Sequence, residues 1–151
     1  MANLTVGDML DRAQAFEHRL QDFYATVRDA SSSDGVRLLT HYLSRYRDHL
    51  PNALAALSPS TRHRIRCATI KYDDTAFRPE RTFAELEVPA NVDSRGVLDI
   101  AIELVTELIS FYNWINRQPI GSEVKALIQS LLKIEETHVV ELKKTRAMDY
   151  F

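Results

Sequence analysis

The sequence has a single cysteine and few of the residues that interrupt helices. Cys67 stands alone, so the chain can form no internal disulfide and has no Cys-x-x-Cys metal site. Only four glycines and five prolines occur in 151 residues, which leaves long stretches free of helix breakers. No apolar run approaches the roughly 18 residues of a membrane-spanning helix. These absences favour an all-α chain that does not cross a membrane.

An excess of charge of one sign is also missing. The 19 basic and 21 acidic residues leave a net charge of −2, which gives no electrostatic footprint for nucleic acid or an anionic membrane. The basic run RHRIR, residues 62–66, is short, and such runs are usually solvated. The first residues do not combine a basic segment with an apolar one. We therefore expect a cytoplasmic protein with one domain over residues 1–151.

Apolar residues recur with the period of an α-helix in four stretches. The first follows Thr5, and Asp8 stands three residues later, which predicts a helix with a capped start. The turn DASSSDG, residues 29–35, precedes a second helix that runs to Leu57. Pro51 lies inside this second stretch, and we expect a kink there because proline removes a backbone hydrogen bond.

The second half of the chain repeats this arrangement. A third helix begins near residue 93 or 94, and the turn NRQPIGS, residues 116–122, leads into a fourth over about 122–147. Between the halves, ATIKYDD indicates a short extended piece and PERTFAEL a short helix. Short turns join antiparallel helices, whereas a long connection lets the second and third helices run parallel. We predict an antiparallel four-helix bundle with a crossover at about residues 58–92.

The fourth helix carries ionisable residues where its seven-residue repeat calls for apolar ones. Continuing the repeat, Ile128 leads to Glu135 and Leu131 leads to His138. Burying a carboxylate costs several kcal/mol unless another group compensates it. The motif KIEETHVVEL therefore raises the question of what compensates Glu135.

The two halves of the chain resemble each other and add two residues to this motif. AQAFEHRLQDFY, residues 13–24, aligns with AIELVTELISFY, residues 101–112, and RYRDHL aligns with IEETHV so that His49 matches His138. Glu17 lies on the apolar side of the first helix. Three helices thus direct a carboxylate or imidazole toward one core, and no Lys or Arg shares their stripes. Such a set suits iron, manganese or zinc.

At these motifs the sequence resembles the rubrerythrin-like branch of the ferritin-like superfamily, over roughly residues 8–57 and 93–147. The resemblance implies two irons held by a Glu on the first and third helices and by Glu-x-x-His on the second and fourth. Glu17, His49, Glu135 and His138 match that ligand set. Tyr46 and Val105 stand where the family has the two remaining glutamates. Glu103 and Glu107 flank Val105 but are expected to face outward.

Two functions follow from this incomplete set. The first is a metal-binding, ferritin-like protein whose reduced, mononuclear site has two His and two Glu ligands, with Tyr46 beside it and a role in iron or oxygen chemistry. The alternative is a metal-free bundle that serves as a structural or interaction module, in which Glu135 and His138 satisfy each other and His49 is a core histidine. We also predict a homodimer, with Trp114 and Phe151 at an outer face. Whether the chain is an enzyme stays open.

Overall fold

The computed structural model describes residues 4–45, 48–71, 73 and 75–149, and most of them are helical. The helices are α1 Val6–Ala30, α2 Asp34–Ser44, α3 His49–Ala55, α4 Pro59–Cys67, α5 Pro79–Ala84, α6 Ser94–Asn116 and α7 Ser122–Met148. Two short strands, β1 Leu4–Thr5 and β2 Thr69–Ile70, pair antiparallel with Leu4 opposite Ile70. The prediction of an all-α chain is confirmed.

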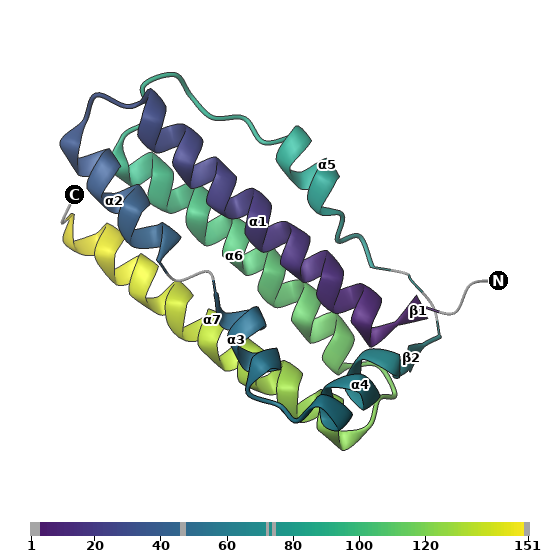
Figure 1. The fold of residues 1–151 in the computed structure, drawn as a ribbon. Coiled ribbons are helices and arrows are strands. Elements are labelled where there is room, and N and C mark those ends of the chain that lie inside the picture. Colours follow the sequence, from purple (N-terminus) through teal and green to yellow (C-terminus); the bar gives the residue numbers. More distant parts are fainter. Residues whose placement is uncertain (1–3, 46–47, 72, 74, 150–151) are drawn as a thin grey trace.

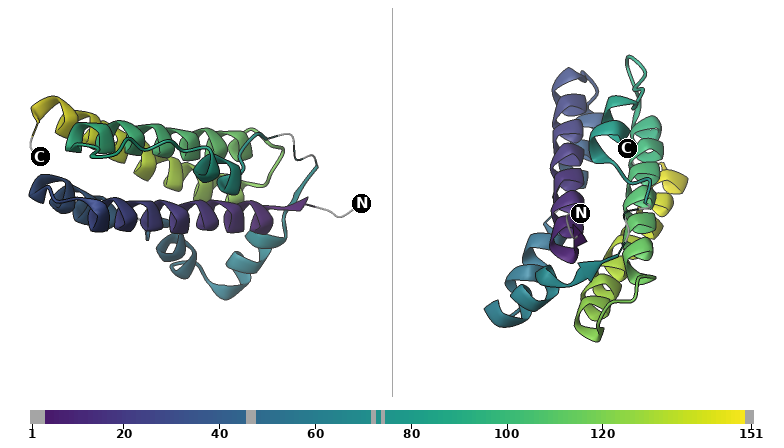
Figure 2. Two further views of the ribbon diagram at one scale, coloured as in Figure 1. Left: turned by 90° about the horizontal axis from the view of Figure 1, so that it is seen from above. Right: turned by 90° about the vertical axis from the view of Figure 1, so that its right-hand side faces the viewer.

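The long helices lie along one another in two antiparallel pairs. α1 and α2 form the first pair, α6 and α7 form the second, and α2 and α6 run in the same direction (Figure 1). α1 also packs against α6, and both run along the long direction of the molecule (Figure 2). In the described residues, no helix combines the length and the apolar character needed to cross a membrane.

The start of α1 is fixed by the predicted cap. The Asp8 amide donates to Oγ1 of Thr5 at 3.1 Å, and the Thr5 amide donates to Oδ2 of Asp8 at 2.9 Å. This reciprocal pair satisfies two amides that the first helical turn leaves without partners. Gly7 then allows α4 to approach, because a Cβ there would lie 2.9 Å from the carbonyl oxygen of Arg66.

The second predicted helix is interrupted rather than kinked. α2 ends at Ser44, and a new helix, α3, begins at His49. Pro51 is the third residue of α3 and so lies in its first turn. There the missing amide removes no helical hydrogen bond, because the first amides of a helix have no partner within it. The expectation of a kink at Pro51 was therefore wrong.

The crossover holds one helix that the apolar pattern did not reveal. β2 and α5 lie within the two segments expected to be extended and helical, but α4 was not predicted. Its start carries a signal, since Ser58 accepts from the Thr61 amide and Pro59 occupies the first helical position.

The basic run of α4 binds its neighbours. Arg62 donates to the carbonyl oxygens of Leu54 and Leu57 at 3.1 Å each, so it covers the end of α3. Arg64 pairs with Glu123 of α7 at 3.0 Å, and Arg66 pairs with Asp11 of α1 at 2.9 Å. These three arginines join α4 to three other helices.

A second group of arginines joins the crossover to α1. Asp73 accepts from Nη1 and Nη2 of Arg12 at 3.3 and 3.0 Å, and from Nη2 of Arg78 at 3.2 Å. The side chains of Arg12 and Asp73 are each only 20% exposed. The hydrogen bond from Arg12 holds the pKa of the Asp73 carboxyl below its usual range.

Candidate metal centre

The interrupted repeat of α7 faces the core as predicted. Ile128 and Leu131 are buried, and one heptad later Glu135 is 1% exposed and His138 is 4% exposed. α7 is continuous, and residues seven positions apart lie on the same face of a helix, so Glu135 and His138 face the core as Ile128 and Leu131 do. An ionisable pair therefore replaces apolar residues inside the core.

Glu17 is buried in the same way on α1. It follows Ala13 and precedes Leu20, which are both fully buried, and it is itself 2% exposed. The aligned residue of α6, Val105, is also fully buried. At these two aligned positions of the core, α1 therefore has the carboxylate of Glu17 and α6 has the apolar side chain of Val105.

Glu103 and Glu107 do not fill the position left by Val105. Glu103 is exposed, as expected. Glu107 is half-buried, and its Oε1 accepts from the Thr82 hydroxyl of α5 at 2.9 Å. Glu107 therefore faces the crossover and not the interior of the bundle.

His49 differs from the other three predicted ligands in its exposure and its setting. It is half-buried and begins α3, whose cap residue Asp48 makes no side-chain capping bond. α3 packs against α7. Because α2 ends at Ser44, His49 lies on a short separate helix that packs beside α7. Tyr46, the expected neighbour, lies outside the described residues.

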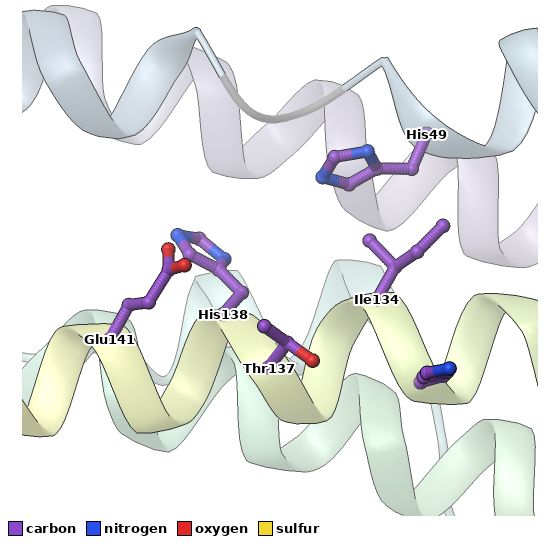
Figure 3. Close-up of a pocket in the computed structure, with 6 residues that line it drawn as sticks. His49, Ile134, Thr137, His138 and Glu141 are labelled. Carbon is purple, nitrogen blue, oxygen red and sulfur yellow. The ribbon is translucent and has the colours of Figure 1, made fainter.

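A cavity of 310 Å³ lies between α3 and α7. His49 lines it from α3, and the α7 side of the cavity is formed by Lys133, Ile134, Thr137, His138 and Glu141. His49 lies on the α3 side of the cavity, and His138 and Glu141 project into it from α7 (Figure 3). The structure therefore brings two predicted ligands, His49 and His138, to one opening.

The remaining predicted ligands do not line this cavity. Glu17 and Glu135 lie in the core and are absent from its walls. Among the described residues, no three His, Cys, Asp or Glu side chains are grouped so that they could hold a metal ion. The complete ligand set of two His and two Glu stays a prediction.

Glu141 is the residue at this cavity that sequence reasoning missed. It follows His138 by three residues, so the two side chains project from neighbouring positions on one helix face. The same spacing separates Glu135 from His138. That spacing was an available signal, but Glu141 lies outside the apolar stripe from which the candidate ligands were predicted.

The ionisable side chains buried in the core are carboxylates and an imidazole. Among the described residues, no lysine or arginine is buried, whereas two glutamates and one histidine are. Lys133 reaches the cavity between α3 and α7 from an exposed position. Imidazole and carboxylate donors of this kind fit iron, manganese or zinc by ligand type.

In comparisons with protein-family models, with curated proteins and with solved structures, nothing matches this chain. The resemblance to rubrerythrin-like proteins remains an expectation from the residues and motifs quoted above.

Proposed function

We propose that this chain binds one divalent metal ion, iron foremost, through Glu17, His49, Glu135 and His138. The proposal includes a ferritin-like interpretation of the bundle, which the parallel run of α2 and α6 supports (Figure 1). Iron or oxygen chemistry is the role that this class of site would serve.

One observation carries the proposal. Glu17, Glu135 and His138 are at most 4% exposed in a core without a buried lysine or arginine among the described residues. A cation would offset the cost of burying two carboxylates, and His49 lines the same cavity as His138. Since no three such side chains converge in the described residues, binding of a metal ion requires the predicted ligands to move closer to one another.

The alternative function is a metal-free bundle that acts as an interaction module. The lack of a convergent group of three metal-binding side chains among the described residues favours it. In that case the buried ionisable residues form a polar network inside the bundle. Such networks are retained in some proteins because they fix how helices pair.

Metal content decides between the two functions. The chain is purified without a metal-affinity tag, incubated with Fe²⁺, Mn²⁺ or Zn²⁺, desalted, and analysed by mass spectrometry for metals. We expect retention of one metal per chain and a melting temperature that falls after chelation. His49→Ala should lower affinity by about tenfold or more. His41→Ala, which removes an exposed histidine of α2, is the matched control and should change nothing. No retained metal and no effect of chelation would leave the metal-free alternative.

The homodimer is a separate part of the proposal. Trp114 is half-buried and stacks on Phe111 with ring centroids 6.1 Å apart, while Phe151 lies outside the described residues. Light scattering should give twice the 17.3 kDa mass of one chain. A mass near that of one chain at high micromolar concentration would contradict the dimer.

A further inference from the structure

A second cavity, of 340 Å³, lies at the end of the bundle where α1 ends and α2 and α6 begin. Its walls come from the last turns of α1, from the turn at residues 31–33, and from residues 88–93 before α6. In Figure 1 both connecting segments reach this end of the molecule. We call it the serine-turn cavity. It shares no lining residue with the cavity between α3 and α7.

One side of the serine-turn cavity is apolar. Phe23 and Val27 line it from α1, and Val88 and Val92 line it from the segment before α6. Val27 is 7% exposed and belongs to the core, whereas Val88 remains 39% exposed. Large exposed apolar side chains beside a concave surface are a feature of ligand sites. The apolar wall is therefore suited to the hydrocarbon part of a small molecule.

The other side offers hydrogen-bonding groups that the protein does not use. Ser31 and Ser33 are engaged, because their hydroxyls accept from the Ser33 and Val36 amides. Within the described residues, the Ser32 hydroxyl and the Asn91 side-chain amide make no hydrogen bond. Asn91 has φ 60°, a left-handed conformation that asparagine adopts more readily than most residues other than glycine.

The charge of the lining narrows the class of ligand. Asp93 is the one charged residue among the lining residues, and its Oδ1 accepts from the Gly96 amide at 2.8 Å. No lysine, arginine or histidine lines the cavity. A carboxylate or phosphate ligand would meet a like charge without a compensating cation. The lining therefore disfavours anions.

We propose that the serine-turn cavity is a binding site for a small uncharged molecule with an apolar body and one hydroxyl or carbonyl group. The apolar body lies against Phe23, Val27 and Val88, and the polar group bonds to Ser32 and Asn91. The volume lies at the lower end of the range for small-molecule sites, so the ligand is small. This site is independent of the metal proposal.

Nuclear magnetic resonance titration with benzyl alcohol tests this site, with benzoate and benzylamine as charged analogues of the same shape. We expect saturable shifts of the amide signals of residues 31–33 and 88–92, with a Kd in the millimolar range. Benzoate should bind about fivefold or more weakly than benzyl alcohol because of Asp93. Tighter binding of benzylamine would overturn the proposal in favour of a cation site, and equal binding of benzoate would also overturn it.

A matched pair of tryptophan variants tests the location. Thr26 lines the cavity and its hydroxyl bonds to the carbonyl oxygen four residues earlier, and Thr106 makes the same bond on an exposed face of α6 away from the cavity. Thr26→Trp should fill the cavity and weaken benzyl alcohol binding by about tenfold or more. Thr106→Trp should leave it unchanged. Equal effects of the two variants, or no saturable shift in the native chain, would overturn the proposal.

A smaller change tests the polar contact and does not depend on whether Thr26→Trp folds. Asn91→Gly keeps the backbone conformation, which glycine adopts without strain, and removes the amide. Loss of one hydrogen bond should weaken benzyl alcohol binding by about three- to tenfold. Far-ultraviolet circular dichroism verifies the fold of each variant. An unchanged affinity of Asn91→Gly for benzyl alcohol would overturn the proposed contact and with it the proposal.

Discussion

The two helix pairs present aligned histidines in different ways. In the second pair His138 lies within α7, a continuous helix over Ser122–Met148, and is 4% exposed. In the first pair the aligned His49 opens the short helix α3 after α2 has ended, and it is half-buried. A continuous helix fixes a side chain through the hydrogen bonds on both sides of it. His49 instead begins a short separate helix, so we expect the α3 side of the candidate site to adjust more readily than the α7 side.

The first prediction tests this difference with one substitution in α7 and one in α3. Leu131 of α7 and Leu50 of α3 are both 1% exposed. Leu131→Ala should lower the free energy of unfolding by about 4 kcal/mol, and Leu50→Ala by about 2 kcal/mol, because a short helix can relax around the lost volume. Urea denaturation measures both. Equal losses would show that α3 unfolds together with α7 and is not an adjustable element.

The second prediction concerns the α7 side of the site. Glu135→Leu restores the apolar repeat of α7, so the metal-free protein should gain about 1 kcal/mol or more. The same variant should bind Fe²⁺, Mn²⁺ or Zn²⁺ about tenfold or more weakly than the native chain, because it removes a ligand. Calorimetric melting with and without metal separates the two effects.

Glu136→Leu is the matched control, since Glu136 is the neighbouring exposed glutamate of α7. It should affect neither metal affinity nor the stability of the metal-free form by more than about 0.5 kcal/mol. If Glu135→Leu leaves metal binding intact, Glu135 is not a ligand. If it destabilises the metal-free protein, the buried network contributes to stability without metal.

The same contrast explains how much of the fold was predictable from sequence. The cap at Thr5 and the continuous α7 depend on residues near one another, and both were predicted. The interruption between α2 and α3 was not predicted. The apolar stripe continues through Pro51, so the sequence pattern gives no sign that one helix ends and another begins. α4 was missed because its residues are mostly polar, although Ser58 and Pro59 mark its start.

The candidate site was predictable to a similar extent. Burial of Glu17, Glu135 and His138 followed from the helical period alone. The cavity that joins His49 to His138 depends on where the short helix α3 lies against α7, and no local pattern encodes that position. Glu141 became a candidate only once this packing was known.

The third prediction compares how each helix pair is held to the crossover. Asp73 joins the crossover to α1 through Arg12 and is 20% exposed. Its pKa is lowered, chiefly by the hydrogen bond from Arg12, so its folded value lies below the unfolded value. Its stabilisation is therefore full above the unfolded value of about 3.9 and is lost as the pH falls through the lower folded value. Asp73→Asn should cost about 1–2 kcal/mol at neutral pH.

Urea denaturation at several pH values measures the difference between the native chain and Asp73→Asn. The difference should shrink toward zero in strongly acidic solution. For the second pair, the Arg64–Glu123 contact is exposed on both sides, and Glu123→Gln should leave the urea midpoint unchanged. A larger effect of Glu123→Gln than of Asp73→Asn would reverse the comparison.

The smallest expected effect lies at the two helix starts. α1 begins with the capping box of Thr5 and Asp8, whereas α7 begins at Gly121 without a side-chain capping bond. Gly121 has φ −68°, and a Cβ there would meet nothing within 4 Å, so a serine fits without strain. Gly121→Ser supplies an acceptor for the first amides of α7 and should stabilise the chain by a few tenths of a kcal/mol, or about 1 °C in Tm.

Thr5→Ala makes the opposite change at α1 and should cost about 1 kcal/mol. Gly121→Ala separates the cap from a change in the unfolded chain. Alanine restricts the unfolded backbone as serine does, but it offers no acceptor and is a poor cap. Calorimetry should therefore show Gly121→Ala to be no more stable than the native chain. If alanine stabilises as much as serine, the gain arises from the reduced entropy of the unfolded chain, and the uncapped start of α7 is not a weakness relative to α1.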